Sequence, residues 1–427
     1  MRRITRLSAI LALAFAPIQL TAQTATSTPP PRIQSGFDAA RLARIDKFLQ
    51  RYVDRNEMAG AVALVLRDGR PVYERAVGWA DKESGRRMTT DAIFRIASQS
   101  KAITSAAILM LVEEGDIALT DPVSRFIPQF AHTTVATGPD TARVIAKANR
   151  EITIRDLLTH TSGISYGTDP IVAPLYSAKG LGPSAGWGWY TADKNEPICT
   201  TMERLASLPF VAQPGEKWVY GYNIDILGCV VERASGIPFD QFVRTRITEP
   251  LGMKDTFFFI PPDKRQRLVT VYMSDSTKHI RRAPEGPKGQ GNYVEGSRRN
   301  FSGGAGLLST ARDYGRFLQM IANGGQLDGV RVLSPNTVRL MSTNQVGSLM
   351  EAWEPGRGFG LGFGIDGATG LASAGTYGWG GAYGSMYSVD PKEHVIVVFM
   401  MNQLPNQADV NSKFQTLVYQ ALVEPNY

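Results

Sequence analysis

The chain has 427 residues, of which 43% are hydrophobic and 20% charged, and its formal net charge is +7. This composition excludes a disordered chain and a multi-span membrane protein, because it matches that of ordinary globular proteins. Basic residues between Lys264 and Arg299 alternate with Pro, Gly and acidic residues. That pattern is typical of a solvated loop and argues against nucleic-acid binding.

The N-terminal residues have the pattern of a secretion signal. Three arginines within the first six residues precede an apolar run over residues 7–20, which contains Pro17 and is followed by small residues. The run is short for a bilayer span, although a retained membrane anchor is the alternative. We expect a signal peptide over residues 1–25, a flexible lead-in over residues 26–35, and a secreted or periplasmic protein without stable membrane insertion.

Hydrophobic periodicity predicts a helix, a β-hairpin and a second helix at the start of the folded part. Residues 40–54 have helical spacing, and residues 60–66 and 71–77 are β-rich runs separated by the turn sequence Arg-Asp-Gly-Arg at residues 67–70. A long apolar pattern over residues 103–112 predicts a buried helix.

The rest of the chain has a helical middle and a strand-rich end. Two long stretches, residues 165–199 and 261–300, lack a regular pattern. They are either loops that line a binding site or surface loops without a function. Because both ends are strand-rich, we expect them to contribute to one sheet with a helical insertion between them. Further helices are expected over residues 153–158, 202–205, 226–234, 239–246, 311–322 and 409–422, and strands over residues 358–365, 375–379, 382–389 and 395–401.

The chain contains two cysteines, Cys199 and Cys229, and four histidines. Nothing in the sequence brings the cysteines together. Cys229 lies in an apolar helical pattern, so we expect a buried thiol in the core; a disulfide with Cys199, which an oxidising compartment would allow, is the alternative. The histidines have no spacing typical of zinc ligands, so we expect no metal site.

Ser98-x-x-Lys101 is the one Ser-x-x-Lys sequence in the chain. Its serine follows a strand-like segment at residues 93–96 and lies at the start of an expected helix. A serine and a lysine three residues apart share one helical face, so the amine can take the hydroxyl proton when burial disfavours its charge. The helix N-terminus also favours negative charge at the serine. The alternative is a capping serine beside a solvent-exposed lysine.

Two further motifs could complete such a site. Tyr220 lies just before an expected helix, where a phenol can relay protons between nucleophile and leaving group. On a late strand, Trp379 is followed by Gly380 and Gly381, which would let a substrate lie against the backbone with an N–H aimed at an oxyanion. The alternatives are a core aromatic residue and a bulge or tight turn.

In this order the motifs resemble those of the serine β-lactamase and penicillin-binding superfamily, in its class C-like branch, and most closely the family VIII carboxylesterases. The resemblance covers about residues 40–420. It implies one α+β domain of the β-lactamase/D,D-peptidase-like fold over residues 36–427, with the active site between two parts. In the α/β part, at about 36–105 and 302–427, helices flank an antiparallel sheet, and the part at about 106–301 is mainly helical. The other stretches that carry the resemblance are residues 157–164, 214–216, 250–253 and 303–314.

The resemblance also implies roles for individual residues. Ser98 would be the acylated nucleophile, Lys101 its proton acceptor, and Tyr220 the proton shuttle. The backbone N–H groups of Ser98 and Ala382 would form the oxyanion hole. No cofactor is implied. The expected substrate-binding residues are Trp379, Gly380, Gly381 and Tyr222.

Two departures from the β-lactamases of this branch decide the expected substrate. Those enzymes carry Tyr-x-Asn, whereas the third position here is Tyr222, the second candidate for the relay, and Asn223 comes one place late. They also carry Lys-Thr-Gly on the late strand, where this chain has Trp379, an indole that packs against apolar groups and cannot pair with a carboxylate. We therefore expect a serine carboxylesterase for neutral short-chain carboxylic esters, with weak side activity on β-lactams at most.

Two other hypotheses stay open at this point. One is a class C-like β-lactamase or D,D-peptidase, which a lysine in place of Trp379 would have indicated. The other is a non-catalytic cell-wall-binding module, which would tolerate loss of Ser98, Lys101 or Tyr220. A Ser-His-Asp hydrolase is disfavoured because no histidine lies in a recognisable triad context. The sequence predicts a small-molecule ester as the partner and no particular oligomeric state.

Overall fold

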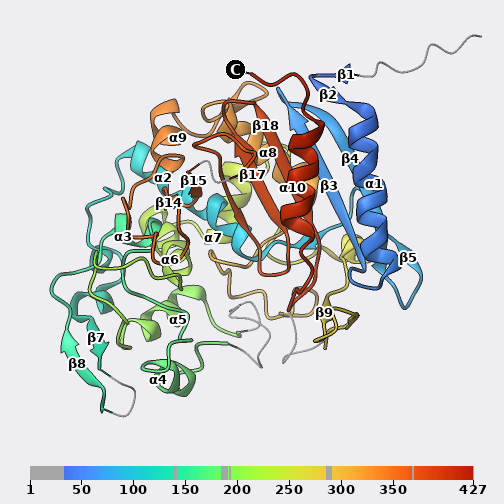
Figure 1. Cartoon of the computed structure of the whole chain (residues 1–427). Coiled ribbons are helices and arrows are strands. Elements are labelled where there is room, and N and C mark those ends of the chain that lie inside the picture. Colours follow the sequence, from blue (N-terminus) through green and yellow to red (C-terminus); the bar gives the residue numbers. More distant parts are fainter. Residues whose placement is uncertain are drawn as a thin grey trace, which may run out of the picture.

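A computed structural model describes residues 33–138, 142–183, 191, 194–284, 291–367 and 370–426 (Figure 1). The expected signal peptide and most of the lead-in lie outside the described residues. Along the described residues, no helix is both long enough and apolar enough to cross a bilayer.

An eight-stranded antiparallel sheet is built from both ends of the chain, and the expected α+β fold class is confirmed. The two ends meet where the register places Val395 opposite Arg67 and Met400 opposite Val62. The expected hairpin turn at residues 67–70 is present. One expected strand, over residues 358–365, is instead two short strands. In spatial order the strands are β14 (Arg357–Phe359), β15 (Gly364–Asp366), β16 (Tyr377–Gly380), β17 (Met386–Asp390), β18 (Val395–Met400), β3 (Gly60–Arg67), β4 (Arg70–Asp81) and β5 (Arg86–Arg87).

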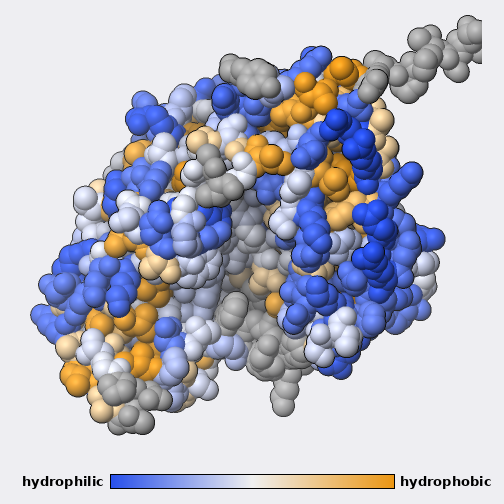
Figure 2. All heavy atoms as spheres, in the orientation of Figure 1, coloured by the Kyte–Doolittle hydropathy of each residue, from blue (hydrophilic) through white to orange (hydrophobic). Residues whose placement is uncertain are grey.

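Helices α1 (Ala39–Asp54) and α10 (Val410–Ala421) cover one face of this sheet and α8 (Ala311–Ala322) covers the other, while α2 (Ser100–Glu114) packs against the helices of the middle region. Alternate side chains of the central strands point to opposite faces. Val65 and Phe399 pack with α1 and α10, which lie side by side over one face (Figure 1). Leu64 and Val398 join the larger core on the other face, which includes α8 and α2. The solvent side of α1 is hydrophilic, as expected for an amphipathic helix (Figure 2).

The middle of the chain forms a mainly helical region against α2, whose residues Ser100 to Leu111 are all buried. The expected helix over residues 239–246 ends at Val243 and continues as a π-helical turn to Thr248. The short helix α4, which contains a proline, was not predicted. The helices of this region are α3 (Ile154–Leu158), α4 (Ala173–Ala178), α5 (Ile198–Leu205), α6 (Asn223–Ser235) and α7 (Phe239–Val243).

Short elements complete the described fold. The pairing of β6 with β11 holds the segment that leads into α2. These elements are the strand pairs β1 (Ile33–Gln34) with β2 (Phe37–Asp38), β6 (Phe94–Arg95) with β11 (Leu308–Ser309), β7 (Thr134–Thr137) with β8 (Val144–Lys147), β9 (Tyr272–Ser274) with β10 (Ile280–Arg282) and β12 (Gln326–Leu327) with β13 (Val330–Arg331), the helix α9 (Pro335–Met341), and the 3₁₀ helices Val123–Arg125, Pro128–His132 and Pro262–Arg267.

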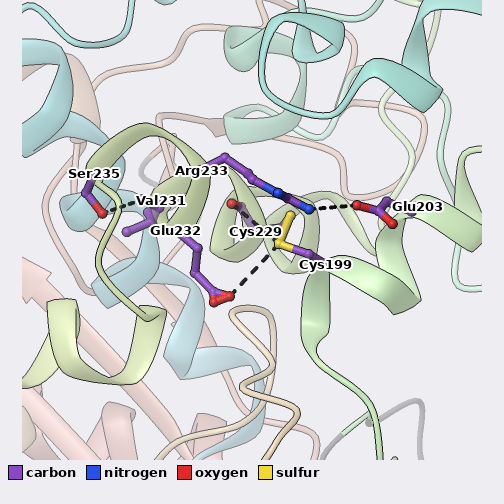
Figure 3. Close-up of a disulfide and its surroundings, with 7 residues drawn as sticks. All are labelled: Cys199, Glu203, Cys229, Val231, Glu232, Arg233 and Ser235. Carbon is purple, nitrogen blue, oxygen red and sulfur yellow. Dashed lines mark hydrogen bonds and ion pairs between the residues drawn. A yellow bond between two sulfur atoms is a disulfide. The ribbon is translucent and has the colours of Figure 1, made fainter.

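Cys199 and Cys229 form a disulfide, so the expected buried thiol at Cys229 is wrong (Figure 3). The bond joins α5 to α6, which pack against each other. Their packing brings the two Cα atoms to 4.9 Å, a separation that suits a disulfide. The sequence could not supply this distance, because it depends on how two separate helices meet.

Replacing both cysteines by serine is expected to lower the free energy of unfolding by about 3.5 kcal/mol. The bond closes a loop with a sequence separation of 30 residues, and removing it frees that loop in the unfolded state. Urea unfolding with and without reductant measures the effect. The reductant should destabilise the wild type and leave the double variant unchanged; a wild type that is insensitive to full reduction contradicts the prediction.

Candidate active site

The candidate nucleophile lies where the chain passes from β6 into α2. Ala97 has a φ of +45°, which is uncommon for a residue with a Cβ atom, and it begins the 3₁₀ turn Ala97–Gln99 that continues into α2. Lys101 Nζ lies 3.1 Å from Ser98 Oγ, and Lys101 is only 2% exposed. Gln99 occupies the N-cap position of α2. The alternative of a capping serine beside a solvent-exposed lysine is therefore wrong.

The Lys101 amine has three hydrogen-bond partners. Besides Ser98 Oγ, it donates to the Gly304 carbonyl oxygen at 2.7 Å and to the Tyr166 hydroxyl at 3.0 Å. The Tyr220 ring lies over the amine, with its centroid 4.7 Å from Nζ. These contacts hold Nζ within hydrogen-bond distance of Ser98 Oγ. This is the geometry that a proton acceptor for the serine needs.

A buried carboxylate holds the loop that presents the Gly304 carbonyl. Asp225 Oδ1 accepts hydrogen bonds from Ser302 Oγ and from the Gly304 N–H, the latter at 3.1 Å. Burial raises the pKa of Asp225, against the opposing effects of the Lys101 charge and of these hydrogen bonds. A Cβ atom at Gly304 would lie 2.4 Å from Asp225 Oδ2, so the loop needs glycine there. Asp225 thus positions Lys101 indirectly, through the loop.

Tyr220 and Trp379 meet at the site, although the chain separates them widely. Trp379 Nε1 donates a hydrogen bond of 3.0 Å to the Tyr220 hydroxyl oxygen. The Tyr220 ring is stacked on Trp218, with centroids 5.7 Å apart and planes at 14°. The site therefore carries the indole of Trp379, and the phenol of Tyr220 is held in a fixed orientation.

The hairpin between β16 and β17 packs against the turn that carries Ser98. Ala382 lies against a small cluster that contains Ala97 and Tyr383. The Gly381 N–H donates to the Ser385 carbonyl at 2.8 Å, and a Cβ atom at Gly381 would lie 2.6 Å from the Ile96 carbonyl oxygen. This close approach requires glycine and brings the backbone of Ala382 alongside the serine turn.

Tyr222 was expected to contact the substrate, and its position contradicts that expectation. Its side chain is buried, with 1% of its surface exposed. The hydroxyl accepts a hydrogen bond of 2.9 Å from the Gly182 N–H, and the ring packs edge-on against Tyr166. Tyr222 therefore has a structural role, which is to pack against the ring of Tyr166. The sequence could not distinguish it from Tyr220, because two residues next to a helix start can point to opposite sides.

A second polar network joins the segments that precede Tyr166 and Tyr220. Asn223 Nδ2 donates to His160 Nδ1 at 2.9 Å and to the Val219 carbonyl, while its Oδ1 accepts from Ser162. His160 is fully buried, and its ring lies 4.8 Å from that of Tyr220. Burial, together with the Lys101 charge, lowers the pKa of His160 well below its usual value. Asn223, one place late for the β-lactamase motif, is thus a structural link between two loops.

The neutral state of His160 predicts a pH dependence of stability. Below about pH 6.5 the unfolded chain binds a proton on this side chain and the folded protein does not, so protons favour unfolding. As the pH is lowered, the free energy of unfolding of the wild type should therefore fall more steeply than that of a His160→Gln variant. The difference between the two slopes should be about 1.4 kcal/mol per pH unit. Urea titrations from pH 6.5 to 5 measure the two slopes. Parallel slopes would contradict the prediction.

A Gly-x-Ser-x-Gly sequence is present at residues 163–167, but it is not a nucleophile elbow. Such an elbow lies between a strand and a helix and exposes its serine. Residues 163–167 belong to no regular element, and Ser165 is 2% exposed. Its Oγ accepts a hydrogen bond of 3.0 Å from the Gly167 N–H. This serine shapes the loop that carries Tyr166.

Tyr166 is the functional candidate that the sequence missed. It follows the stretch at residues 157–164 that contributed to the family resemblance, but no local pattern indicated that its hydroxyl would reach Lys101. Within the described residues, no group of three or more His, Cys, Asp or Glu side chains is placed to hold a metal ion. The site brings together a serine, an amine, phenols and backbone N–H groups.

Comparison with known proteins agrees with this geometry. A sequence model of the β-lactamase family matches residues 45–421. The chain belongs to the β-lactamase family. This family member is 35% identical over 398 residues to esterase EstB of Burkholderia gladioli, covering 89% of this chain and 94% of EstB.

Solved structures extend the comparison. The hydrolase EstCE1, described as having promiscuous acyltransferase activity, superposes with a TM-score of 0.73 at 27% identity, over 90% of this chain and 99% of EstCE1. Simvastatin synthase LovD from Aspergillus terreus has a TM-score of 0.72 at 24% identity, over 90% and 98% of the two chains, and shares the fold. The expected membership in the β-lactamase-like serine hydrolase superfamily is confirmed.

Proposed function

We propose that the protein is a serine carboxylesterase that works through an acyl-Ser98 intermediate. The observation that carries the proposal is the buried Lys101 amine, 3.1 Å from Ser98 Oγ and held from behind by Gly304 and Tyr166. EstB and EstCE1, the similar esterase and hydrolase, support the same reaction class.

The proposed reaction has two halves. Ser98 Oγ attacks the ester carbonyl carbon while Lys101 takes the hydroxyl proton. The N–H groups of Ser98 and Ala382 stabilise the resulting oxyanion, which contributes roughly 3 to 4 kcal/mol per donor. The intermediate collapses to the acyl-serine, and the alcohol leaves with a proton that passes from Lys101 through the Tyr220 hydroxyl. Water then attacks the acyl carbon with the same groups in reverse roles, which releases the acid and restores Ser98.

The aromatic residue at position 379 supports neutral esters as substrates. Trp379 occupies the place where a lysine would bind a substrate carboxylate, and its Nε1 is engaged by Tyr220. An indole can pack against apolar groups but cannot neutralise a charge. We propose short-chain carboxylic esters as substrates, with weak turnover of β-lactams.

Secretion or a periplasmic location is also proposed. The basic start and apolar run of residues 1–25 support it. A disulfide between Cys199 and Cys229 is consistent with an oxidising compartment. Signal-peptide cleavage, read from the mass of the exported protein, tests the location.

A substrate panel tests the proposed activity. Wild type and Ser98→Ala are assayed on p-nitrophenyl acetate, butyrate and octanoate, and on nitrocefin. We expect the wild type to prefer the short esters over nitrocefin and to lose this activity in Ser98→Ala. Full ester turnover in Ser98→Ala would overturn the assignment of the nucleophile, and an efficiency on nitrocefin far above that on the esters would establish a β-lactamase.

The two tyrosines are expected to differ in role. Tyr220→Phe should lower kcat/KM by about 10²-fold on benzyl butyrate, whose alkoxide must be protonated, and much less on p-nitrophenyl butyrate, whose phenolate leaves unaided. Tyr166→Phe removes a hydrogen bond to Lys101 and should lower kcat/KM on the two esters to a similar extent, by about tenfold. Tyr222→Phe, which also removes one hydroxyl, is the matched control. Equal losses on both esters in Tyr220→Phe would contradict the relay.

A further inference from the structure

A cavity of about 990 Å³ begins beside the two tyrosines that contact Lys101. Four aromatic residues line it, Tyr166, Trp218, Tyr220 and Trp353. The end of β7 and residues 168–171 also line the cavity. The cavity is far larger than a short acyl chain needs, since sites of 300 to 1,000 Å³ hold whole drug-sized ligands.

Trp353 provides an open aromatic face in this cavity. It is 53% exposed, although it is a large apolar side chain. Its inner side is fixed by Trp218, at a centroid distance of 4.8 Å, and by Trp379, at 5.9 Å with planes at 20°. The indole is thus held in place while part of its surface stays open. Such a surface suits a planar ring, which can stack on it or contact it edge to face.

The charges of the cavity favour a neutral ligand. Among the described residues that line it, Lys217 and Asp169 are the charged ones, so a cation and an anion balance each other. The remaining lining is aromatic, aliphatic or hydroxyl-bearing. A ligand with a net charge would gain little here, whereas a neutral ring would bury apolar surface.

The chemistry of the site decides which part of an ester enters this cavity. The leaving alcohol oxygen must lie within hydrogen-bond reach of the group that protonates it. In the proposed reaction that group is the hydroxyl of Tyr220, a residue that lines the cavity. The cavity therefore lies beside the group that protonates the leaving alcohol, whereas Gly381 and Ala382 do not line it.

We propose that this cavity is the subsite for the alcohol part of the substrate, and that it selects neutral alcohols with a planar ring system. This inference rests on the proposed esterase function and names the substrate class of the same site. Trp353 is its specificity-determining residue. The natural ester then combines a small acyl group with a ring-bearing alcohol.

Esters with one acyl group and three alcohols of similar leaving ability test the subsite. For ethyl, benzyl and 2-naphthylmethyl butyrate, we expect wild-type kcat/KM to rise with ring size. Trp353→Ala should lower the ratio of the naphthylmethyl to the ethyl value by about tenfold, and Trp353→Phe by less. Leu371→Ala is the matched control, because Leu371 is also exposed, at 57%, and does not line this cavity.

A reversed ester separates the alcohol side from the acyl side. Ethyl 2-naphthylacetate carries the ring on its acyl group, so its kcat/KM relative to ethyl butyrate should be insensitive to Trp353→Ala. An unchanged naphthylmethyl-to-ethyl ratio in Trp353→Ala, or a loss seen only with the reversed ester, would overturn the inference. Absence of hydrolysis of every ester by the wild type would instead refute the proposed function.

Discussion

Replacing Lys101 by methionine is expected to lower kcat/KM for ester hydrolysis by about 10³ to 10⁴-fold. The variant keeps a side chain of similar length and removes the amine that faces Ser98 Oγ. The Gly304 carbonyl and the Tyr166 hydroxyl lose their donor, so we also expect a destabilisation of about 1 to 3 kcal/mol. Steady-state kinetics and thermal unfolding measure the two effects separately.

Lys101→Arg distinguishes a base from a fixed positive charge. A guanidinium keeps the charge but cannot accept a proton near neutral pH. If Lys101 acts as the base, the arginine variant stays as inactive as the methionine variant. Substantial activity in Lys101→Arg would show that the charge alone assists Ser98, and would refute the assigned role.

Gly381→Ala is expected to lower kcat by about 10² to 10³-fold, the loss typical of removing an oxyanion-hole donor. The added methyl group would lie 2.6 Å from the Ile96 carbonyl oxygen and 2.4 Å from Ser385 Oγ, so the hairpin must move away from the serine turn. That movement displaces the N–H of Ala382, while the sheet can remain intact. KM should change less than kcat, because the oxyanion forms only after the attack.

Gly370→Ala is the matched control for this substitution. A Cβ atom at Gly370 meets no atom within 4 Å, so the same chemical change causes no displacement there. Both variants should give the wild-type far-ultraviolet circular dichroism. If Gly381→Ala retains full activity, the hairpin does not supply the oxyanion donor.

Local patterns in the sequence predicted the regular elements well. The helix α2 was expected from an apolar run and the hairpin of β3 and β4 from its turn residues, since both depend on neighbouring positions. The helix α4 was missed because it is short and contains Pro174. The disulfide was missed because it depends on the packing of α5 against α6.

The same distinction applies to the site. The Ser98–Lys101 contact follows from helical spacing, so the sequence could predict it. The meeting of Tyr220 with Trp379 was inferred from the order of the motifs in a known family, and no spacing could have shown it. Tyr166 and Asp225 act on Lys101 through tertiary contacts between segments far apart in the sequence. Tyr222 was misassigned because its role depends on its burial. The sequence does not specify which side chains at the start of a helix are buried.

The pairing of β18 with β3 has a consequence for how the molecule is made. Arg67 and Glu393, which form a buried ion pair, are 326 residues apart in the sequence. Most of the chain is therefore synthesised while one edge of β3 has no partner strand. Such an unpaired edge can form a sheet with other chains. The sheet and the oxyanion side of the site can form only after the last strands have been synthesised. The nascent polypeptide is consequently inactive, and it is vulnerable to aggregation until translation is nearly complete.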